Sequence, residues 1–285
     1  MGINLQEVSF CYTPNRKKEK NVYALKDASL NISSNGEFIC VVGHTGSGKS
    51  TLIQLLNTLL IPTEGNVVID DRVINKKKCD NLKEIKRKIG LVFQFAEYQL
   101  FEETVIKDIE FGPKNFKVKD YHKKAIDACS LVGLDEKFYE KSPFRLSGGE
   151  MRKVAIAGIL ASDPDILILD EPTVGLDPFT RRELLNLLKE LNEKGKTIII
   201  VTHDMDVVGE MAKRVIVIDD KFIVYDGSKD DLFKNDDLVN KHHLDMPDTV
   251  KILQNVKERL NVDIDVYKYT VEDAFNEIKK AMNHE

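Results

Sequence analysis

The feature that most constrains the fold is an unbroken run of three segments with different sequence character. FICVV (38–42) is short and apolar at every position, as in a strand buried on both faces. The next residues, GHTGSGKS (43–50), are rich in glycine, and TLIQLLNTLL (51–60) places its leucines at helical spacing. The order strand, glycine-rich loop, helix predicts an α/β protein whose first helix begins at a loop that can approach a ligand closely.

The glycine-rich loop fits the spacing G-x-x-x-x-G-K-[ST]. In such a loop the glycines let the backbone wrap a pyrophosphate, Lys49 reaches the β- and γ-phosphates, and the hydroxyl of Ser50 holds magnesium. A plain glycine turn is the alternative, but the position between a strand and a helix favours the phosphate site. The nucleotide-binding residues predicted from this segment are Gly43, His44, Thr45, Gly46, Ser47, Gly48, Lys49, Ser50 and Thr51.

Two later segments, DILILD (165–170) and TIIIV (197–201), are also apolar on both faces, and a helical pattern separates them. This alternation predicts a parallel sheet covered by helices on two sides. The segments before residue 75 alternate as β-strands and a hairpin, and the pattern is helical from about 95 to 163. We therefore expect one main domain over 1–227 and a small helical extension over 228–285.

Charged and polar residues follow three of the predicted strands. Asp170 ends a buried strand, where a carboxylate suits a water-mediated magnesium ligand, and Glu171 is the candidate general base for a water molecule. Gln94 and His203 end two further strands. Ligands of open parallel sheets bind at the carboxyl ends of the strands, so these groups are expected to converge. A simple turn at Asp170 and ordinary polar roles for Gln94 and His203 are the alternatives.

A second anion-binding pattern lies about a hundred residues after the phosphate loop. LSGGE (146–150) directly precedes the helical pattern MRKVAIAGILAS. The first turn of a helix presents unpaired N–H groups, and the helix dipole favours negative charge there. The sequence therefore holds two segments that suit phosphate, far apart in the chain.

The charge, the apolar runs and the cysteines of the chain limit which partners and which cell compartment are expected. The net charge of −5 provides no general attraction to nucleic acid. The longest apolar runs are much shorter than the ~20 residues that a membrane-spanning helix needs. The four cysteines show neither CxxC pairing nor metal-ligand spacing, which favours reduced thiols in a cytoplasmic protein.

Over roughly residues 1 to 230 these motifs, in this order, resemble the nucleotide-binding subunit of an ABC transporter. The resemblance implies a P-loop NTPase fold with a RecA-like core, an antiparallel β subdomain and an α-helical subdomain. It also implies that two subunits pack head to tail with ATP between them. The resemblance assigns Tyr12 to adenine, with Tyr23 as the weaker candidate, Gln94 to magnesium and His203 to the γ-phosphate. It also places Ser147, Gly148 and Gly149 against the partner's ATP, and Asp177 as the link between the two sites. The family most often has Gln where this chain has Glu150.

A finer resemblance is to the second ATPase type of energy-coupling-factor (ECF) transporters, through VFQFAEYQLFEETV (92–105), DIEFGPKNF (108–116) and GHTGSGKST. It implies a heterodimer with a related ATPase on the cytoplasmic face of the membrane, and an extension that adds dimer contacts. It further implies a membrane scaffold protein and a separate membrane protein that captures a vitamin or metal ion. The scaffold's coupling helix, bearing arginine, would dock near Gln94, in a groove rimmed by Glu97, Glu102 and Glu103.

Three alternatives remain at this stage. The first is the ATPase of a conventional ABC importer. The second is a soluble ABC protein acting on DNA or ribosomes, which the absence of a heptad run disfavours. The third is a regulatory module that binds ATP without hydrolysing it, which the presence of Glu171 and His203 disfavours.

Overall fold

A computed structural model describes residues 2–13, 22–79 and 82–282 of the chain. The chain forms two compact units. The first compact unit comprises residues 1–37 and 50–201, and the second comprises residues 38–49 and 202–285. One boundary between the units therefore falls between Lys49 and Ser50, just after the glycine-rich loop.

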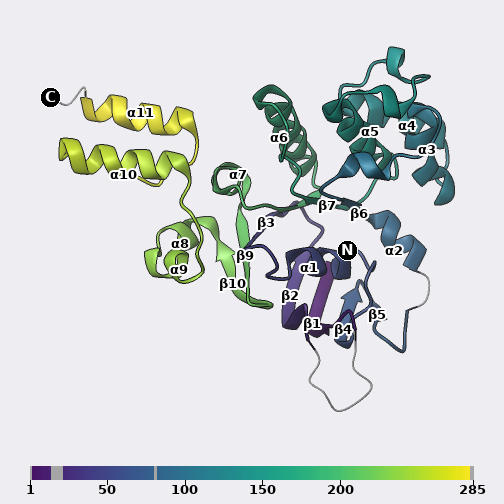
Figure 1. Ribbon diagram of the computed structural model, residues 1–285, viewed down its shortest axis with the longest axis horizontal. Helices are drawn as coiled ribbons and strands as arrows, with labels where there is room; N and C mark the ends of the chain where they lie inside the picture. Colours follow the sequence, from purple (N-terminus) through teal and green to yellow (C-terminus); the bar gives the residue numbers. More distant parts are fainter. Residues whose placement is uncertain (1, 14–21, 80–81, 283–285) are drawn as a thin grey trace. The chain divides into compact units, whose positions relative to one another are not determined.

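The first compact unit contains an antiparallel sheet with the strand order β2-β1-β4-β5 (Figure 1). Strands β1 and β2 pair along most of their length, and β4 and β5 form the hairpin that the sequence predicts. Ile3, Leu5 and Val8 of β1 are fully buried, which explains why the alternating pattern fixes the register of this sheet. The strands are β1 (Gly2–Phe10), β2 (Leu25–Ser33), β4 (Glu64–Ile69) and β5 (Arg72–Ile74).

Three parallel strands of the same unit lie in the order β8-β7-β6. They are β6 (Ile89–Val92), β7 (Ile166–Asp170) and β8 (Thr197–Val201). Every residue of β6, β7 and β8 is buried, as expected for parallel strands with both faces covered. Because these strands are parallel, the residues that follow Val92, Asp170 and Val201 lie along one edge of the sheet.

Helices make up the rest of the first compact unit. They are α1 (Lys49–Leu56), whose first residue belongs to the other unit, α2 (Leu82–Lys88), α3 (Val105–Asn115), α4 (Tyr121–Leu131), α5 (Gly148–Leu160) and α6 (Pro178–Glu193). Helices α3, α4 and α5 contact one another, with Ile109, Ala128 and Val154 buried. The helical character expected from about 95 to 163 is thus present, with short 3-10 turns between the helices.

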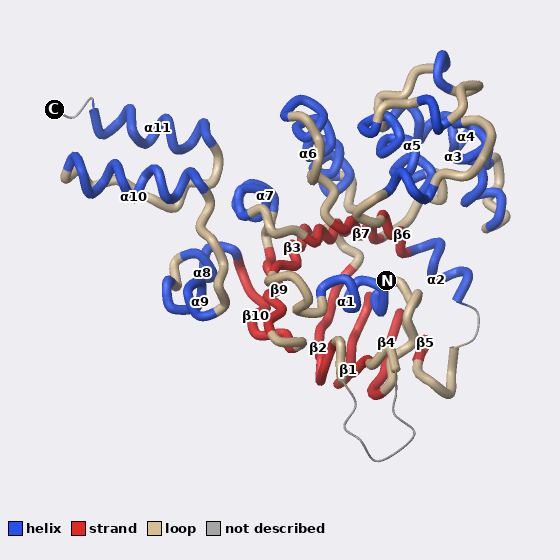
Figure 2. Tube along the Cα trace, viewed as in Figure 1, coloured by secondary structure: helices blue, strands red, loops and turns tan. Residues whose placement is uncertain are grey.

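The second compact unit contains the strands β3, β9 and β10 and the C-terminal helices (Figure 2). Strand β3 (Phe38–Val42) pairs in parallel with β9 (Arg214–Asp219), and β9 forms an antiparallel hairpin with β10 (Phe222–Ser228). Helix α7 (Met205–Met211) precedes β9. The C-terminal helices are α8 (Lys229–Phe233), α9 (Asp236–Lys241), α10 (Asp248–Leu260) and α11 (Val271–Met282).

Helices α10 and α11 lie side by side and enclose a small core of Leu253, Ile264 and Ala274. This core explains why the amphipathic patterns near the end of the sequence form a helical pair. Within the described part of the chain, no helix combines the length and the apolar character that a bilayer crossing requires.

Candidate functional site

The phosphate loop, residues 43–48, connects β3 to α1. Gly43 has a φ of 143°, and a Cβ atom there would lie 2.1 Å from the carbonyl oxygen of Ile218, so only glycine fits. The ammonium group of Lys49 donates hydrogen bonds to the carbonyl oxygens of Gly43 and His44, at 2.7 and 2.9 Å. The loop therefore closes around the lysine side chain. His44, Thr45 and Gly46 are exposed, Gly48 is partly buried, and Ser47 is buried.

In the first compact unit, the hydroxyl of Ser50 donates a hydrogen bond to Oδ2 of Asp170 at 3.2 Å. A hydroxyl and a carboxylate are the hard oxygen donors that Mg²⁺ prefers, and Mg²⁺ usually completes its shell with water and phosphate oxygens. Among the described residues, no group of three His, Cys, Asp or Glu side chains could hold a metal by itself. The pair therefore fits a magnesium ion that is bound together with a nucleotide.

Glu171 follows β7 directly and is only 9% exposed. Its φ of 45° is in the left-handed region, which is costly for a residue with a side chain. The N–H of Glu171 donates to the carbonyl oxygen of Val201 at the end of β8, which anchors this conformation. The strained backbone holds a carboxylate next to Asp170 at the sheet edge where the sequence places the general base.

The LSGGE segment begins α5, with Ser147 as its N-cap. The hydroxyl of Ser147 accepts from the N–H of Glu150 at 3.3 Å, and Oε2 of Glu150 accepts from both the N–H and the hydroxyl of Ser147 at 2.8 Å. These bonds form a capping box and hold the pKa of Glu150 below its usual range. Gly148 has open space around its Cα, so the first turn of α5 can approach an anion.

Three further residues predicted from the sequence lie just outside regular elements. Gln94 and His203 are each two residues past the end of a strand, β6 and β8, rather than inside it. Asp177 is the N-cap of α6, and its carboxylate accepts from Thr180 and from the backbone N–H of Phe179. The hydrogen bond from the Thr180 hydroxyl is the main reason that the pKa of Asp177 is lowered.

The two tyrosines considered for adenine stacking have different surroundings. Tyr12 is 60% exposed, packs edge-on against Phe10, and its hydroxyl lies 3.3 Å from that of Thr51 in α1. The hydroxyl of Tyr23 instead donates to Glu64 at 2.6 Å. The ring of Tyr12, exposed beside the start of α1, is better placed than that of Tyr23 to stack on adenine.

Arg152 is a residue of the site that the sequence analysis did not identify. It is 8% exposed, and its guanidinium donates to the carbonyl oxygens of Gln94, Pro172 and Val174 at 2.8–3.0 Å. It thereby connects α5 to the loop after β6 and to the loop after Glu171. The available signal was its position four residues before Ile156, on the apolar face of the helix.

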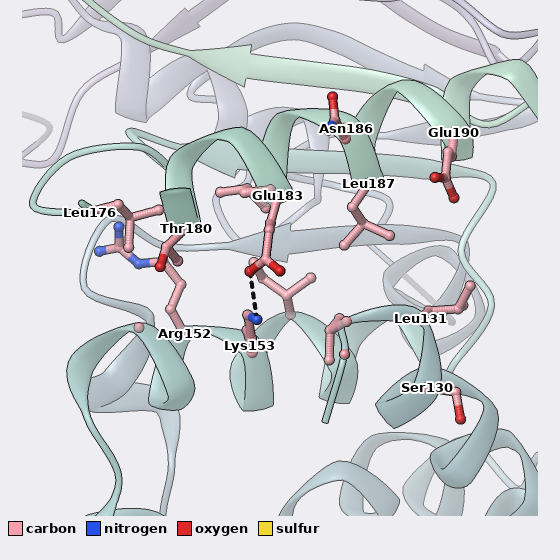
Figure 3. Close-up of a pocket in the computed structure, with 15 residues that line it drawn as sticks. Ser130, Leu131, Arg152, Lys153, Leu176, Thr180, Glu183, Asn186, Leu187 and Glu190 are labelled. Atoms are coloured by element: carbon pink, nitrogen blue, oxygen red, sulfur yellow. Dashed lines mark hydrogen bonds and ion pairs between the residues drawn. The ribbon is translucent and has the colours of Figure 1, made fainter. Parts of the chain in front are cut away.

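A pocket of about 300 Å³ lies between the C-terminal end of α4 and the helices α5 and α6 (Figure 3). Arg152, Leu176 and Thr180 lie at one end of the pocket, and Ser130 lies at the other. An ion pair of 2.9 Å between Lys153 of α5 and Glu183 of α6 crosses it. The pocket includes Gly149 but no other residue that the sequence predicts for the site.

Comparison with known proteins shows the family. The family model described as ABC transporter matches residues 25–174. The energy-coupling factor transporter ATP-binding protein EcfA2 of Streptococcus pneumoniae (strain D39) is 46% identical over 262 residues, which cover 91% of this chain and 93% of that protein. The chain belongs to the ECF branch of the ABC transporter ATP-binding subunits.

Solved structures that share the fold of this chain support its place in the family. cbiO1 from Clostridium perfringens, part of the ABC transporter complex cbiONQ, matches with a TM-score of 0.72 and 32% identity, over 91% of this chain and 95% of that one. The ATP-binding cassette MJ0796, as a dimer bound to ADP and Pi, matches with a TM-score of 0.70 and 36% identity, over 79% of this chain and 98% of its own. The expected α/β ABC fold and the resemblance to the second ECF ATPase type are thus confirmed.

Proposed function

We propose that this ECF-family chain binds and hydrolyses ATP to drive a membrane importer for vitamins or metal ions. The observation that carries the proposal is the similarity to EcfA2 over 91% of the chain, because it extends beyond the ABC transporter model at residue 174 to the C-terminal helices. This similarity favours the ATPase of an ECF transporter over a soluble ABC protein acting on DNA or ribosomes and over a conventional importer ATPase.

The roles of the phosphate-binding residues follow from their local chemistry. Residues 43–51 wrap the triphosphate, and Lys49 exchanges its two loop carbonyls for phosphate oxygens. Ser50 and Asp170 hold magnesium, with Gln94 as a further ligand; a bound magnesium ion neutralises charge on the phosphates. Tyr12 stacks on adenine. His203, exposed between buried Thr202 and the α7 cap Asp204, contacts the γ-phosphate.

Glu171 orients the attacking water and accepts its proton, which its place after Asp170 and its fixed backbone support. Ser147, Gly148 and Gly149 contact the ATP bound to a partner subunit, since the first turn of α5 presents N–H groups to an anion. Asp177 connects the two sites of the pair.

We further propose that the working form is a heterodimer with a related ATPase, bound peripherally at the cytoplasmic face. A membrane scaffold protein docks near Gln94, and a separate membrane protein captures the substrate. Exposed Phe95, Tyr98 and Phe101 follow Gln94 and support a docking surface there. The proposed main domain is 1–227, and the proposed extension, 228–285, contributes dimer contacts through exposed apolar residues such as Phe275.

Substitution of the proposed base tests hydrolysis. Glu171→Gln keeps the shape of the side chain but cannot accept the proton, so we expect ATP binding to remain and turnover to fall by about 100-fold or more. Glu190→Gln, an exposed acid on α6, is the matched control and should keep full turnover. Unchanged turnover in Glu171→Gln would remove Glu171 from this role.

The assembly is tested by affinity purification of the tagged chain from membranes of its own cells. Identification of the co-purifying proteins should give a second, non-identical ATPase and two kinds of membrane protein. Recovery of a homodimer on paired transmembrane subunits would instead support the conventional importer.

A further inference from the structure

One side of the phosphate loop rests on the turn between β9 and β10. The carbonyl oxygen of Ile218 lies against Gly43, as described above. The N–H of Lys221 donates to the carbonyl oxygen of Ser47 at 3.1 Å. Between these two contacts, Oδ1 of Asp219 lies 3.1 Å from Nε2 of His44. The loop is therefore contacted at its beginning, at His44 and near its end by three residues of one hairpin, Ile218, Asp219 and Lys221.

The strand pairing brings these groups together. Strands β3 and β9 are parallel neighbours, and Val42 is paired with Val217. His44 and Asp219 each lie two residues after these partners, at the same edge of the sheet. The register of the sheet thus brings His44 and Asp219 close to each other at this edge.

The other carboxylate oxygen of Asp219 contacts a residue among the C-terminal helices. Oδ2 of Asp219 lies 2.8 Å from Nδ1 of His242, which follows α9 and is only 6% exposed. This hydrogen bond is the main reason that the pKa of Asp219 is lowered, so the carboxylate is ionised at neutral pH and can only accept. His242 must therefore donate through Nδ1–H, and His44 can bond to Asp219 only by donating through Nε2–H.

His44 has a second anchor inside the loop. Its Nδ1 lies 2.8 Å from the carbonyl oxygen of Thr45, which also only accepts. The ring thus faces an acceptor at each nitrogen, and a neutral imidazole can donate to one of them at a time. The backbone carbonyl oxygen of His44 accepts from Lys49. A change in the position of Asp219 would be transmitted to the loop backbone through this ring.

We propose that Asp219 is a positioning residue for the phosphate loop, and that His242 orients Asp219, so that docking of the C-terminal helices and nucleotide binding are energetically coupled. The inference rests on the proposed function, because it takes residues 43–51 to be the nucleotide site. Coupling of this kind is reciprocal: if the docked helices favour nucleotide binding, bound nucleotide favours their docking by the same factor.

Nucleotide titration of the full-length protein tests the inference, with fluorescent ATP and magnesium as the probe. Asp219→Asn places an amide N–H opposite one of two imidazole donors, and His242→Phe keeps a ring but removes the donor. If loss of either contact leaves about one fifth of the loop in the competent arrangement, the apparent Kd rises about 5-fold. Asp220→Asn, the same change at an adjacent exposed residue, is the matched control and should bind like the parent.

A conservative variant separates positioning from general loss of stability. In His242→Asn, the side-chain amide nitrogen takes the place of Nδ1, so we expect the affinity to return to within about 2-fold of the parent. The double variant Asp219→Asn/His242→Phe should bind no more weakly than the weaker single variant, because both break the same link. Hydrogen exchange in α9 should slow when the parent binds nucleotide, and this slowing should be lost in Asp219→Asn.

The outcomes distinguish this inference from the proposed function. A parent protein that does not bind ATP would contradict the proposed function itself. A parent that binds and hydrolyses ATP, with folded His242→Phe and Asp219→Asn binding it equally well, would overturn the coupling alone. Equal loss in His242→Asn and His242→Phe would also overturn it, since the position of the donor would then have no effect.

Discussion

Replacement of Arg152 by methionine should destabilise the first compact unit and slow turnover together. The guanidinium makes three hydrogen bonds to main-chain carbonyl oxygens while 8% exposed. Each buried hydrogen bond to a charged group contributes about 1.5–3 kcal/mol. Relief of the buried charge offsets part of the loss, so we expect the free energy of unfolding to fall by about 3–5 kcal/mol in Arg152→Met.

Arg152→Lys refines this test. The ammonium group keeps the charge but lacks the planar fork that reaches carbonyls on two separate loops. We expect a loss of about 1–3 kcal/mol, because some of the three acceptors remain unsatisfied. Displacement of the loops after Gln94 and Glu171 by even 1 Å should lower the turnover rate by about 10- to 100-fold.

Chemical denaturation and steady-state ATPase measurements on the purified assembly provide the two readouts. Lys153→Met is the matched control on the next residue of α5, because its partly exposed ion pair with Glu183 should contribute only about 0–1 kcal/mol. The reasoning would be refuted if Arg152→Met unfolded within about 0.5 kcal/mol of the parent, or if it kept full turnover.

Further predictions concern the thiols and Glu150 at the start of α5. Cys79 is exposed and the other three cysteines are buried, so a thiol reagent at pH 8 should modify one thiol per native chain and all four after unfolding; fast modification of a second native thiol would contradict this. Glu150→Ala removes half of the capping box, so its free energy of unfolding should fall by about 0.5–1 kcal/mol. The hydrogen bonds from Ser147 hold the pKa of Glu150 below 4.5, so the carboxylate stabilises the fold above that pH. The stability difference between the parent and Glu150→Gln should therefore shrink as the pH falls below 4.5, and a constant difference in pH-dependent denaturation would exclude this role.

The sequence predicted those strands and helices that depend only on residues close together in the chain. FICVV, ILIL (166–169) and IIIV (198–201) lie in buried strands because every side chain in these runs is apolar. The residues after Ser147 begin a helix because Ser147 and Glu150 form a capping box there. The phosphate loop could be recognised because its glycines meet a conformational requirement that few other sequences satisfy. The identities of the individual site residues, beyond the family, stay predictions.

Other parts of the site depend on pairing between distant segments, which a single sequence does not reveal. Arg152 resembles a surface residue of a helix until the loops at Gln94 and Val174 are brought to it. Asp219 and His242 meet through the register of β9 and the turn after α9, 23 residues apart. The sequence also does not reveal the boundary between the two compact units, because Lys49 and Ser50 are neighbours in sequence but belong to different units.

The three acceptors of Arg152 are backbone atoms, and this has a consequence for how the chain can vary. A carbonyl oxygen is present whatever side chain the residue carries, so the residues at 94, 172 and 174 can be exchanged without removing the anchor. Mutagenesis of Gln94 would then report the chemistry of its amide rather than collapse of the surrounding loop. Evolution has the same freedom, because the side chains at these positions can change while the attachment of α5 is kept.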